Sequence, residues 1–224
     1  MLPPAAPTYL SAKTASRNQI NLTWQDNSSV EIGYEIERAL VGGSFVRIAT
    51  TVTSATSYND LSSLDDGIKY QYRVRSYNDA ANSSYSATVS ATTHANIAKG
   101  KTASASSSAS SYPASYGNDS NTTTRWSASS SAVPQWFKVD LGSSRTLSGS
   151  EVRWQNSGVV YKYKIQTSTD NAYWTTRVDM SNNTNTDQVQ TQSFSATARY
   201  VRIYITAVPS GSWASLFEFG VFGL

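Results

Sequence analysis

The chain has 224 residues, of which 39% are hydrophobic and 15% charged, so it is long enough for two modest domains that each bury a core. Its 18 Lys/Arg and 15 Asp/Glu give a formal net charge of +3 and form no basic cluster that would indicate nucleic-acid binding. The chain has no cysteine, which excludes disulfides and thiolate metal sites, and no apolar run approaches the roughly 18 residues of a membrane-spanning helix.

The charges divide unevenly along the chain. Residues 1–94 hold seven Lys/Arg and eight Asp/Glu, whereas residues 95–224 hold eleven and seven, so the net charge is −1 in the first part and +4 in the second. A basic second part favours an acidic partner, although ordinary solvated strand faces are the stronger explanation. The opening residues, Met-Leu-Pro-Pro, lack the pattern of a signal peptide.

Ser, Thr, Asn and Tyr are abundant and no long helical period occurs, so we predict an all-β protein. Between residues 7 and 93, short alternating segments are separated by turn residues roughly every ten positions, which is typical of a β-sandwich. Residues 41–44, Val-Gly-Gly-Ser, predict a hairpin turn, because glycine readily adopts a positive φ. Residues 64–70 predict a corner in which the Tyr70 hydroxyl bonds to backbone upstream.

The residues that carry this pattern are, in chain order, Trp24, Tyr34, Ile36, Leu64, Tyr70, Tyr72 and Val74. Together they resemble a fibronectin type III domain over residues 5–93, which implies an immunoglobulin-like antiparallel sandwich that we assign to residues 1–94. In bacterial polysaccharide-degrading enzymes such domains look like spacers, so the resemblance implies a fold and no activity of its own. The only histidine, His94, is expected in a solvated linker, where no second histidine or cysteine can complete a catalytic or metal site.

Residues 116–126, Tyr-Gly-Asn-Asp-Ser-Asn-Thr-Thr-Thr-Arg-Trp, form a polar loop without helical or strand periodicity. Converging loop oxygens suit a hard cation such as Ca²⁺, which takes roughly six to eight of them. Asp119 and Thr124 can supply several, and Glu218 can supply a second carboxylate, because an unpaired acid in its apolar strand would be costly. The alternative is an Asx-rich turn in which Asp119 and Asn121 cap their own backbone and Glu218 faces water.

The second part of the chain contains alternating segments that predict a second antiparallel sandwich; they are residues 136–142, 151–154, 161–168 and 199–205. Six motifs occur in order at residues 112–115, 119–126, 135–142, 163–174, 199–202 and 218–223. Together they resemble the discoidin, or coagulation-factor C-type (F5/8 type C), domain, whose bacterial branch is similar to family 32 carbohydrate-binding modules (CBM32). The resemblance implies a jelly-roll sandwich over residues 95–224.

The resemblance also implies a structural Ca²⁺ ion. Its ligands would be the carbonyls of Tyr116, Asn121, Thr124 and Phe217, the Thr124 hydroxyl, and the carboxylates of Asp119 and Glu218. This sequence departs from the family at Ser120, where the family usually has glycine after the aspartate.

Sugar sites combine an exposed aromatic ring with planar polar side chains. Of the five tryptophans in the second part, Trp136 and Trp174 are predicted to be structural, and Trp126 can pack beneath a site. Trp213 lies among small residues in Pro-Ser-Gly-Ser-Trp-Ala-Ser, so we predict an exposed ring; the resemblance implies the same, because the family often places its sugar-stacking aromatic in this loop. The alternative is an indole folded back onto the sandwich.

In glucan- and chitosan-binding members of the family, the dipeptide that matches Trp154-Gln155 looks like Trp-Glu. Gln155 keeps a hydrogen-bonding amide but lacks the negative charge of a glutamate, so it favours neutral hydroxyls over an amino-sugar cation. Galactose is not favoured, because residues 127–131 lack the family's histidine and residues 155–161 lack its arginine. The candidate carbohydrate-binding residues are Trp213, Trp154, Gln155, Tyr112, Trp126 and Tyr161.

The sequence therefore predicts a non-catalytic carbohydrate-binding module with a fibronectin-like spacer. We expect it to be monomeric and extracellular, without a membrane partner, and to hold a secreted bacterial glycoside hydrolase or polysaccharide lyase on a neutral glucan or chitosan-like polymer. The alternative is a cell-surface adhesion module that binds glycans or another protein. Paired carboxylates can hydrolyse glycosides, but the best-placed pair, Asp119 and Glu218, is assigned to calcium.

Overall fold

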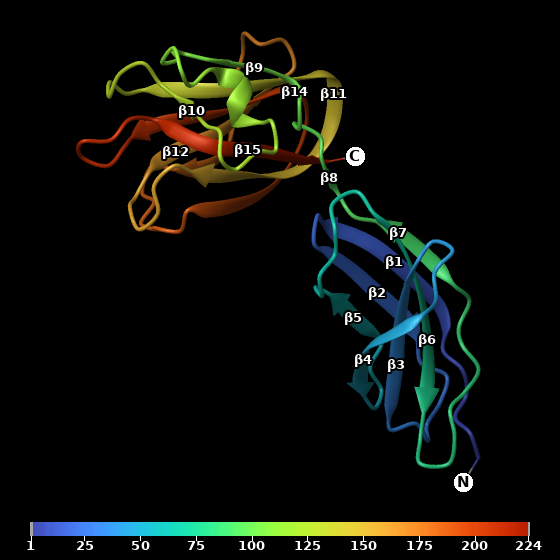
Figure 1. The fold of residues 1–224 in the computed structure, drawn as a ribbon. Helices are drawn as coiled ribbons and strands as arrows, with labels where there is room; N and C mark the ends of the chain where they lie inside the picture. Colours follow the sequence, from blue (N-terminus) through green and yellow to red (C-terminus); the bar gives the residue numbers. More distant parts are fainter. Residues whose placement is uncertain (1, 224) are drawn as a thin grey trace. The chain divides into compact units, whose positions relative to one another are not determined.

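The computed structural model describes residues 2–223, so Met1 and Leu224, the ends of the two predicted domain ranges, lie outside the described residues. The chain is built almost wholly of antiparallel β-strands and divides into two compact units, Met1–Ala95 and Asn96–Leu224 (Figure 1). The predicted all-β class is confirmed. Within residues 2–223 no helix has the length and apolar character needed to span a bilayer.

The first unit is a sandwich of two sheets. One has the order β1 (Thr8–Ser16), β2 (Gln19–Gln25), β5 (Ser57–Asp60), and the other β4 (Val46–Val52), β3 (Gly33–Leu40), β6 (Lys69–Tyr77), β7 (Val89–Thr92). The apolar residues that carry the predicted pattern are all buried, as are Ile20 and Leu22, which alternate with Trp24 on β2; the predicted residues are Trp24, Tyr34, Ile36, Leu64, Tyr70, Tyr72 and Val74. The period of two that places side chains on opposite faces of a strand explains this agreement.

Two local predictions in this unit are confirmed. Gly42 has φ 79°, and Gly43 N–H donates to the Leu40 carbonyl at 2.9 Å, which closes the hairpin between β3 and β4. The corner also forms, because Asp65 N–H donates to the Tyr70 hydroxyl at 2.9 Å. His94 differs from the expectation: it is half-buried, its N–H donates to the Ser16 carbonyl, and burial lowers the pKa of its imidazole.

Replacing Tyr70 by phenylalanine tests the corner. Tyr70→Phe leaves the Asp65 N–H without its partner, and we expect the free energy of unfolding to fall by about 1 kcal/mol, the usual net contribution of such a bond. Urea denaturation measures the change. Tyr9→Phe is the control, because Tyr9 is 83% exposed and its replacement should change stability little. Equal effects of the two substitutions would show that the corner bond contributes nothing.

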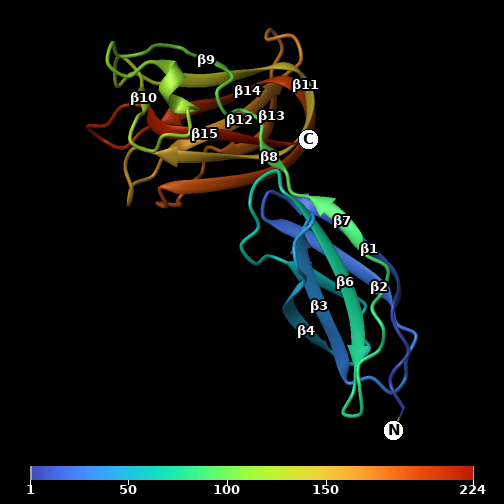
Figure 2. The same ribbon diagram turned by 45° about the vertical axis from the view of Figure 1, so that its right-hand side comes forward.

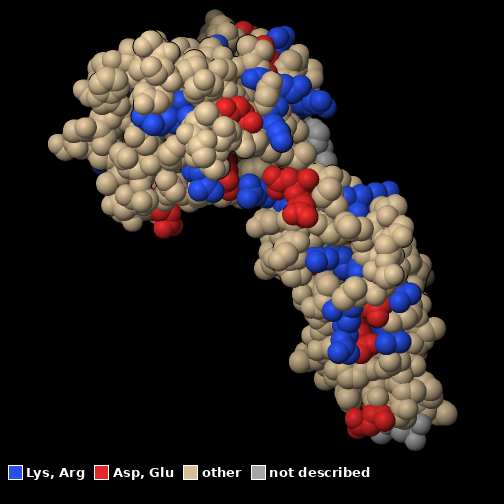
Figure 3. Space-filling view, viewed as in Figure 1, with Lys and Arg blue, Asp and Glu red and all other residues tan. Residues whose placement is uncertain are grey.

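The outer face of the β4-β3-β6-β7 sheet carries paired charges. Arg47 and Arg75 bind the Glu35 carboxylate at 2.6 and 2.7 Å, and Arg73 binds Glu37 at 2.6 Å. Figure 3 shows acidic and basic side chains interleaved on the first unit. Opposite charges on neighbouring strands stabilise the sheet modestly, and here the arginines cover Glu35 and Glu37, which are both buried.

The second unit contains one joined sheet in the order β10-β15-β11-β14-β12-β13, with β8 on β15 and β9 on β11. The bounds are β8 (Ala95–Asn96), β9 (Thr102–Ala105), the 3₁₀ turn η1 (Ala114–Gly117), β10 (Trp126–Ser127), β11 (Gln135–Trp154), β12 (Lys162–Ser168), β13 (Thr175–Met180), β14 (Val189–Ala207) and β15 (Ser215–Gly223). The segments predicted at 136–142 and 151–154 are the two halves of β11, and the segment at 199–205 is one end of β14.

The long strands β11 and β14 connect the two layers of this sandwich. Their pairing is irregular between Asp140 and Arg145, where Gly142 has φ 85°, so both strands bend there and continue in the other layer. Figures 1 and 2 show β11 curving at the end of the sandwich beside the C-terminus. Trp126, Phe137 and Phe219 lie in the core between the layers. The loops beside Trp126, Trp154 and Leu216 lie at the opposite end of the sandwich from this bend.

Candidate functional site

Strand register brings three distant loops together at one end of the second unit. Leu216 of β15 pairs with Trp126 of β10 on one side and with Trp154 of β11 on the other. Ser127 pairs with Ser215, and neighbouring strands lie about 4.8 Å apart, so the residues after Ser127, after Trp154 and before Ser215 must meet. Backbone bonds fix the loops: Ala128 N–H donates to the Ala214 carbonyl at 2.9 Å, and Gln155 N–H to the Ser215 carbonyl at 3.3 Å.

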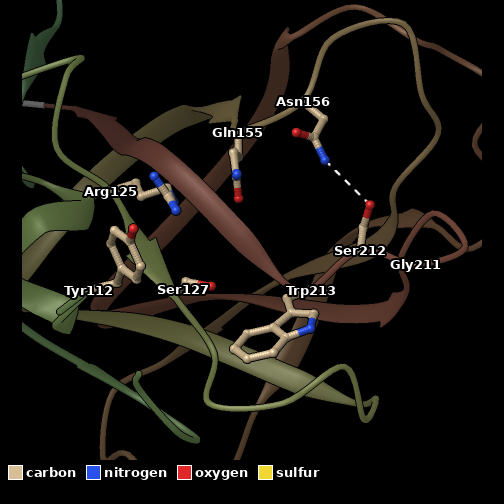
Figure 4. A pocket seen from close by; sticks show the side chains of 8 residues that line it. All are labelled: Tyr112, Arg125, Ser127, Gln155, Asn156, Gly211, Ser212 and Trp213. Atoms are coloured by element: carbon tan, nitrogen blue, oxygen red, sulfur yellow. Dashed lines mark hydrogen bonds between the residues drawn. The ribbon is translucent and has the colours of Figure 1, made fainter. Parts of the chain in front are cut away.

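These loops enclose a pocket of about 270 Å³, shown in Figure 4, whose lining residues are Tyr112, Arg125, Ser127, Gln155, Asn156, Gly211, Ser212 and Trp213. Trp213 is 44% exposed, which confirms the predicted exposure of its ring. Gln155 and Arg125 are directed into the same space (Figure 4). The Arg125 guanidinium lies 3.8 Å from the centre of the Tyr112 ring. The pocket therefore joins an exposed indole to planar polar groups.

Three of the candidate carbohydrate-binding residues are wholly buried: Trp126, Trp154 and Tyr161 each have 0% exposure. A direct contact with sugar is therefore wrong for all three, whereas the prediction that Trp126 packs beneath the site fits its burial. Trp154 and Tyr161 stack with ring centres 4.1 Å apart and planes 6° apart. Trp126 donates its indole N–H to the Ser107 carbonyl at 3.0 Å. All three face the core, so they support the pocket floor and cannot stack on a sugar from solvent.

Several lining residues were missed by sequence reasoning, namely Arg125, Ser127, Asn156, Gly211 and Ser212. A usable signal was strand alternation: if Trp126 faces the core, its neighbours Arg125 and Ser127 must face the other way. The same holds beside Trp154 for Gln155. Gly211 has φ 74°, which explains why a glycine precedes Ser212 and Trp213 in their turn.

Trp136 and Trp174, predicted to be structural, lie half-buried on the outer face of the sheet. They line a shallow cavity of about 140 Å³ with Lys138, Asn171 and Arg202. The Arg202 guanidinium lies 4.1 Å from the Trp174 ring centre and its Nε donates to Gln166 at 2.7 Å. Lys138 lies over the Trp136 ring and Arg202 over the Trp174 ring. Both tryptophans therefore pack against side chains of the sheet surface, and neither belongs to the core.

The predicted calcium ligands form a compact oxygen cluster. Thr124 Oγ1 donates to Asp119 Oδ2 at 2.8 Å and to the Asn121 carbonyl at 2.9 Å. Asn121 N–H donates to Asp119 Oδ1 at 2.8 Å and to Glu218 Oε1 at 3.1 Å, which ties the loop to β15. The carbonyls of Tyr116 and Phe217 stay predicted ligands, since no contact among the described residues joins them to the cluster.

The cluster suits a hard cation by its chemistry. Burial and the neighbouring Asp119 carboxylate raise the pKa of Glu218 to about 7, because two acids share a site without a base. No group of three or more His, Cys, Asp or Glu that could hold a metal occurs in residues 2–223, so any ion here depends on hydroxyl and carbonyl oxygens as well as the two acids. Ser120 has φ 66°, the left-handed conformation that explains the family's preference for glycine.

Comparison with curated proteins finds an alpha-amylase of Niallia circulans that is 41% identical over 96 residues, 41% of this chain. The aligned region is only 7% of the amylase, so this chain spans a small part of that relative.

Among solved structures, chitosan-binding module 1 from the chitosanase/glucanase of Paenibacillus sp. IK-5 is 36% identical, with a TM-score of 0.53; the match covers 58% of this chain and all of that one. A CBM32 module of Clostridium perfringens shares the fold at 22% identity and a TM-score of 0.52, over 58% of this chain and 94% of that one.

The family models match both parts of the chain. The fibronectin type III model matches residues 5–92, and the F5/8 type C model matches residues 102–219, more than half of the chain. The two resemblances drawn from the sequence are therefore confirmed, as is the pairing of an immunoglobulin-like sandwich with a discoidin sandwich. The chain belongs to the F5/8 type C (discoidin) domain family, with a fibronectin type III domain preceding its discoidin domain.

Proposed function

We propose that the discoidin domain binds a glycan at the loop-end pocket and thereby holds a secreted bacterial glycan-degrading enzyme on its polysaccharide. The observation that carries this proposal is Trp213, whose exposed indole faces the same space as Gln155 and Tyr112. Sugar rings present flat apolar C–H faces that stack on an indole, while amides and hydroxyls bind the hydroxyls at the ring edge. The pocket supplies both kinds of group.

The comparisons support this proposal at two levels. A relative that matches the discoidin domain over its full length is a chitosan-binding module, and the curated relative is a bacterial alpha-amylase. We infer that this chain is a non-catalytic, monomeric and extracellular region of a larger glycoside hydrolase or polysaccharide lyase, with the fibronectin type III domain as spacer. The polymer would be a neutral glucan or a chitosan-like chain. None of the eight lining residues is an acid, so the pocket lacks the carboxylate pair of a glycosidase.

We also propose that Ca²⁺ occupies the Asp119–Glu218 cluster as a structural ion. It would neutralise the two adjacent carboxylates and tie the polar loop to β15, the strand that follows the pocket residues Ser212 and Trp213. Arg125 follows Thr124 directly, so an ordered loop also orders one wall of the pocket. The ion would act on binding only through this positioning.

Affinity electrophoresis of the whole chain in native gels tests the proposed function. Gels would contain soluble β-glucans, α-glucans or chitosan, each with calcium present. We expect at least one polymer to retard the chain, and the matching oligosaccharide to restore its mobility. Unchanged mobility in every gel, together with a blank glycan array, would contradict glycan binding and leave the cell-surface adhesion alternative, tested next by protein capture.

A further inference from the structure

The pocket lining carries a charge that bears on which glycans can bind. The inference drawn from it rests on the proposed glycan-binding function. Of the eight lining residues, Arg125 is the only charged one. The carboxylates of Asp119 and Glu218 both accept the Asn121 N–H, and neither residue lines the pocket. A sugar entering the pocket therefore meets one fixed positive charge and no negative charge.

Arg125 is held in place without an anion. Its guanidinium carbon lies over the Tyr112 ring, 3.8 Å from the ring centre, and no ion pair of Arg125 occurs among the described residues. Its Nε is buried and has no hydrogen-bond partner. Stacking on an aromatic ring orients a planar guanidinium group, and an oriented guanidinium can bind a carboxylate through two parallel N–H···O hydrogen bonds. Because Nε is excluded from solvent, the two Nη groups are the donors that can meet an acceptor, and Arg125 lines the pocket, so the ligand would supply that acceptor.

The opposite wall fixes where that acceptor would lie. Trp213 offers its ring at the pocket edge, and Asn156 and Ser212, joined by a 3.4 Å hydrogen bond, form the far side (Figure 4). A sugar ring stacked on the indole would present its edge substituents to Arg125 and Gln155. A carboxylate on that edge would pair with Arg125, a hydroxyl would accept a single bond, and an ammonium group would be repelled.

We propose that Arg125 makes this pocket selective for uronic-acid sugars over neutral ones, and for neutral sugars over cationic glucosamine. Within the proposed glycan-binding function, the preferred polymer would then contain uronic acids and would not be the neutral glucan or chitosan-like chain named above. The chain would thus differ in ligand from its 36% identical chitosan-binding relative. Gln155 is consistent with a preference for uronic acids, since its neutral amide does not repel a sugar carboxylate as a glutamate would.

Isothermal titration of the whole chain with three β-1,4-linked trisaccharides, of glucuronic acid, glucose and glucosamine, tests the proposal. We expect the affinity to fall in that order. The differences in affinity among the three trisaccharides should narrow as the salt concentration rises from about 0.05 M to about 0.5 M, because salt screens the charge of Arg125. Arg125→Gln should weaken glucuronate binding about tenfold and change glucose binding less than about threefold. Arg125→Lys keeps the charge without the fork and should be intermediate.

Arg145→Gln is the matched control, because it removes an exposed charge at the bend of β11, away from the pocket, and should leave all three affinities unchanged. Far-ultraviolet circular dichroism and thermal unfolding confirm that each variant is folded. Glucosamine binding as tight as glucuronate binding, or an Arg125→Gln variant with the original order, would overturn the selectivity and leave the glycan-binding function standing. Failure of all three sugars and of every polymer gel would instead remove the proposed function and the selectivity with it.

Discussion

Trp213→Ala is expected to weaken glycan binding about 30-fold, because truncating the central aromatic of a binding site usually costs about 2 kcal/mol. The indole is 44% exposed and lies in a loop of small residues, so its removal takes away the stacking surface without opening the core. Stability should change by less than about 0.5 kcal/mol, as for other exposed positions. Titration with the best polymer or oligosaccharide from the gel screen measures the loss.

Tyr173→Ala is the matched control for this substitution. Tyr173 is 84% exposed, also lies in a loop of the discoidin domain, and is absent from the pocket lining. It should bind like the unaltered chain. If Trp213→Ala binds normally, or if both substitutions weaken binding equally, the ligand lies elsewhere on the domain and the proposed pocket is wrong.

Calcium at about 100 times its dissociation constant is expected to raise the Tm of the discoidin domain by about 10 °C. Such a concentration adds about 2.7 kcal/mol to the free energy of unfolding, and each kcal/mol moves the Tm of a domain of this size by about 4 °C. Scanning calorimetry with calcium and with chelator measures the shift. The fibronectin type III domain is an internal reference, since it contains none of the proposed ligands.

Two substitutions separate ion binding from general damage. Glu218→Gln should abolish the calcium response but keep or raise the Tm in chelator, because it removes a carboxylate that Asp119 and burial already disfavour. Asp179→Asn is the control; it removes an exposed acid paired with Lys164 at 2.8 Å and should leave the calcium shift intact. A calcium shift that survives Glu218→Gln would place the ion elsewhere, and no shift in the unaltered chain would exclude a structural ion.

Much of the fold is readable from the sequence. Strand alternation at Ile20, Leu22 and Trp24 predicts which residues form the first core, because the side-chain period of a strand is two wherever it lies. The hairpin at Gly42 and the corner at Tyr70 are equally local, since each depends on a few adjacent residues. The order of motifs then identifies both domains.

On the strands, local pattern did not decide which aromatic side chains face solvent. Trp136 and Phe137 are adjacent aromatics on one strand, and either could have faced the core; packing of the second layer buries Phe137 and leaves Trp136 on the outer face. The same uncertainty placed Trp154 and Tyr161 in the predicted sugar site, although their stacked rings belong to the core. Alternation specifies two faces, and only the opposing layer selects the buried one.

The sequence by itself determined the two sandwich domains and the polar loop at residues 116–126, and it predicted the exposure of Trp213, because each follows from short-range periodicity, turn chemistry or ordered motifs. Only the tertiary structure decided that Arg125 and Trp213 share a pocket. These two residues are separated by 88 positions, and their meeting depends on β15 lying between β10 and β11. Strand order is a property of the whole packed sheet, which no local segment encodes.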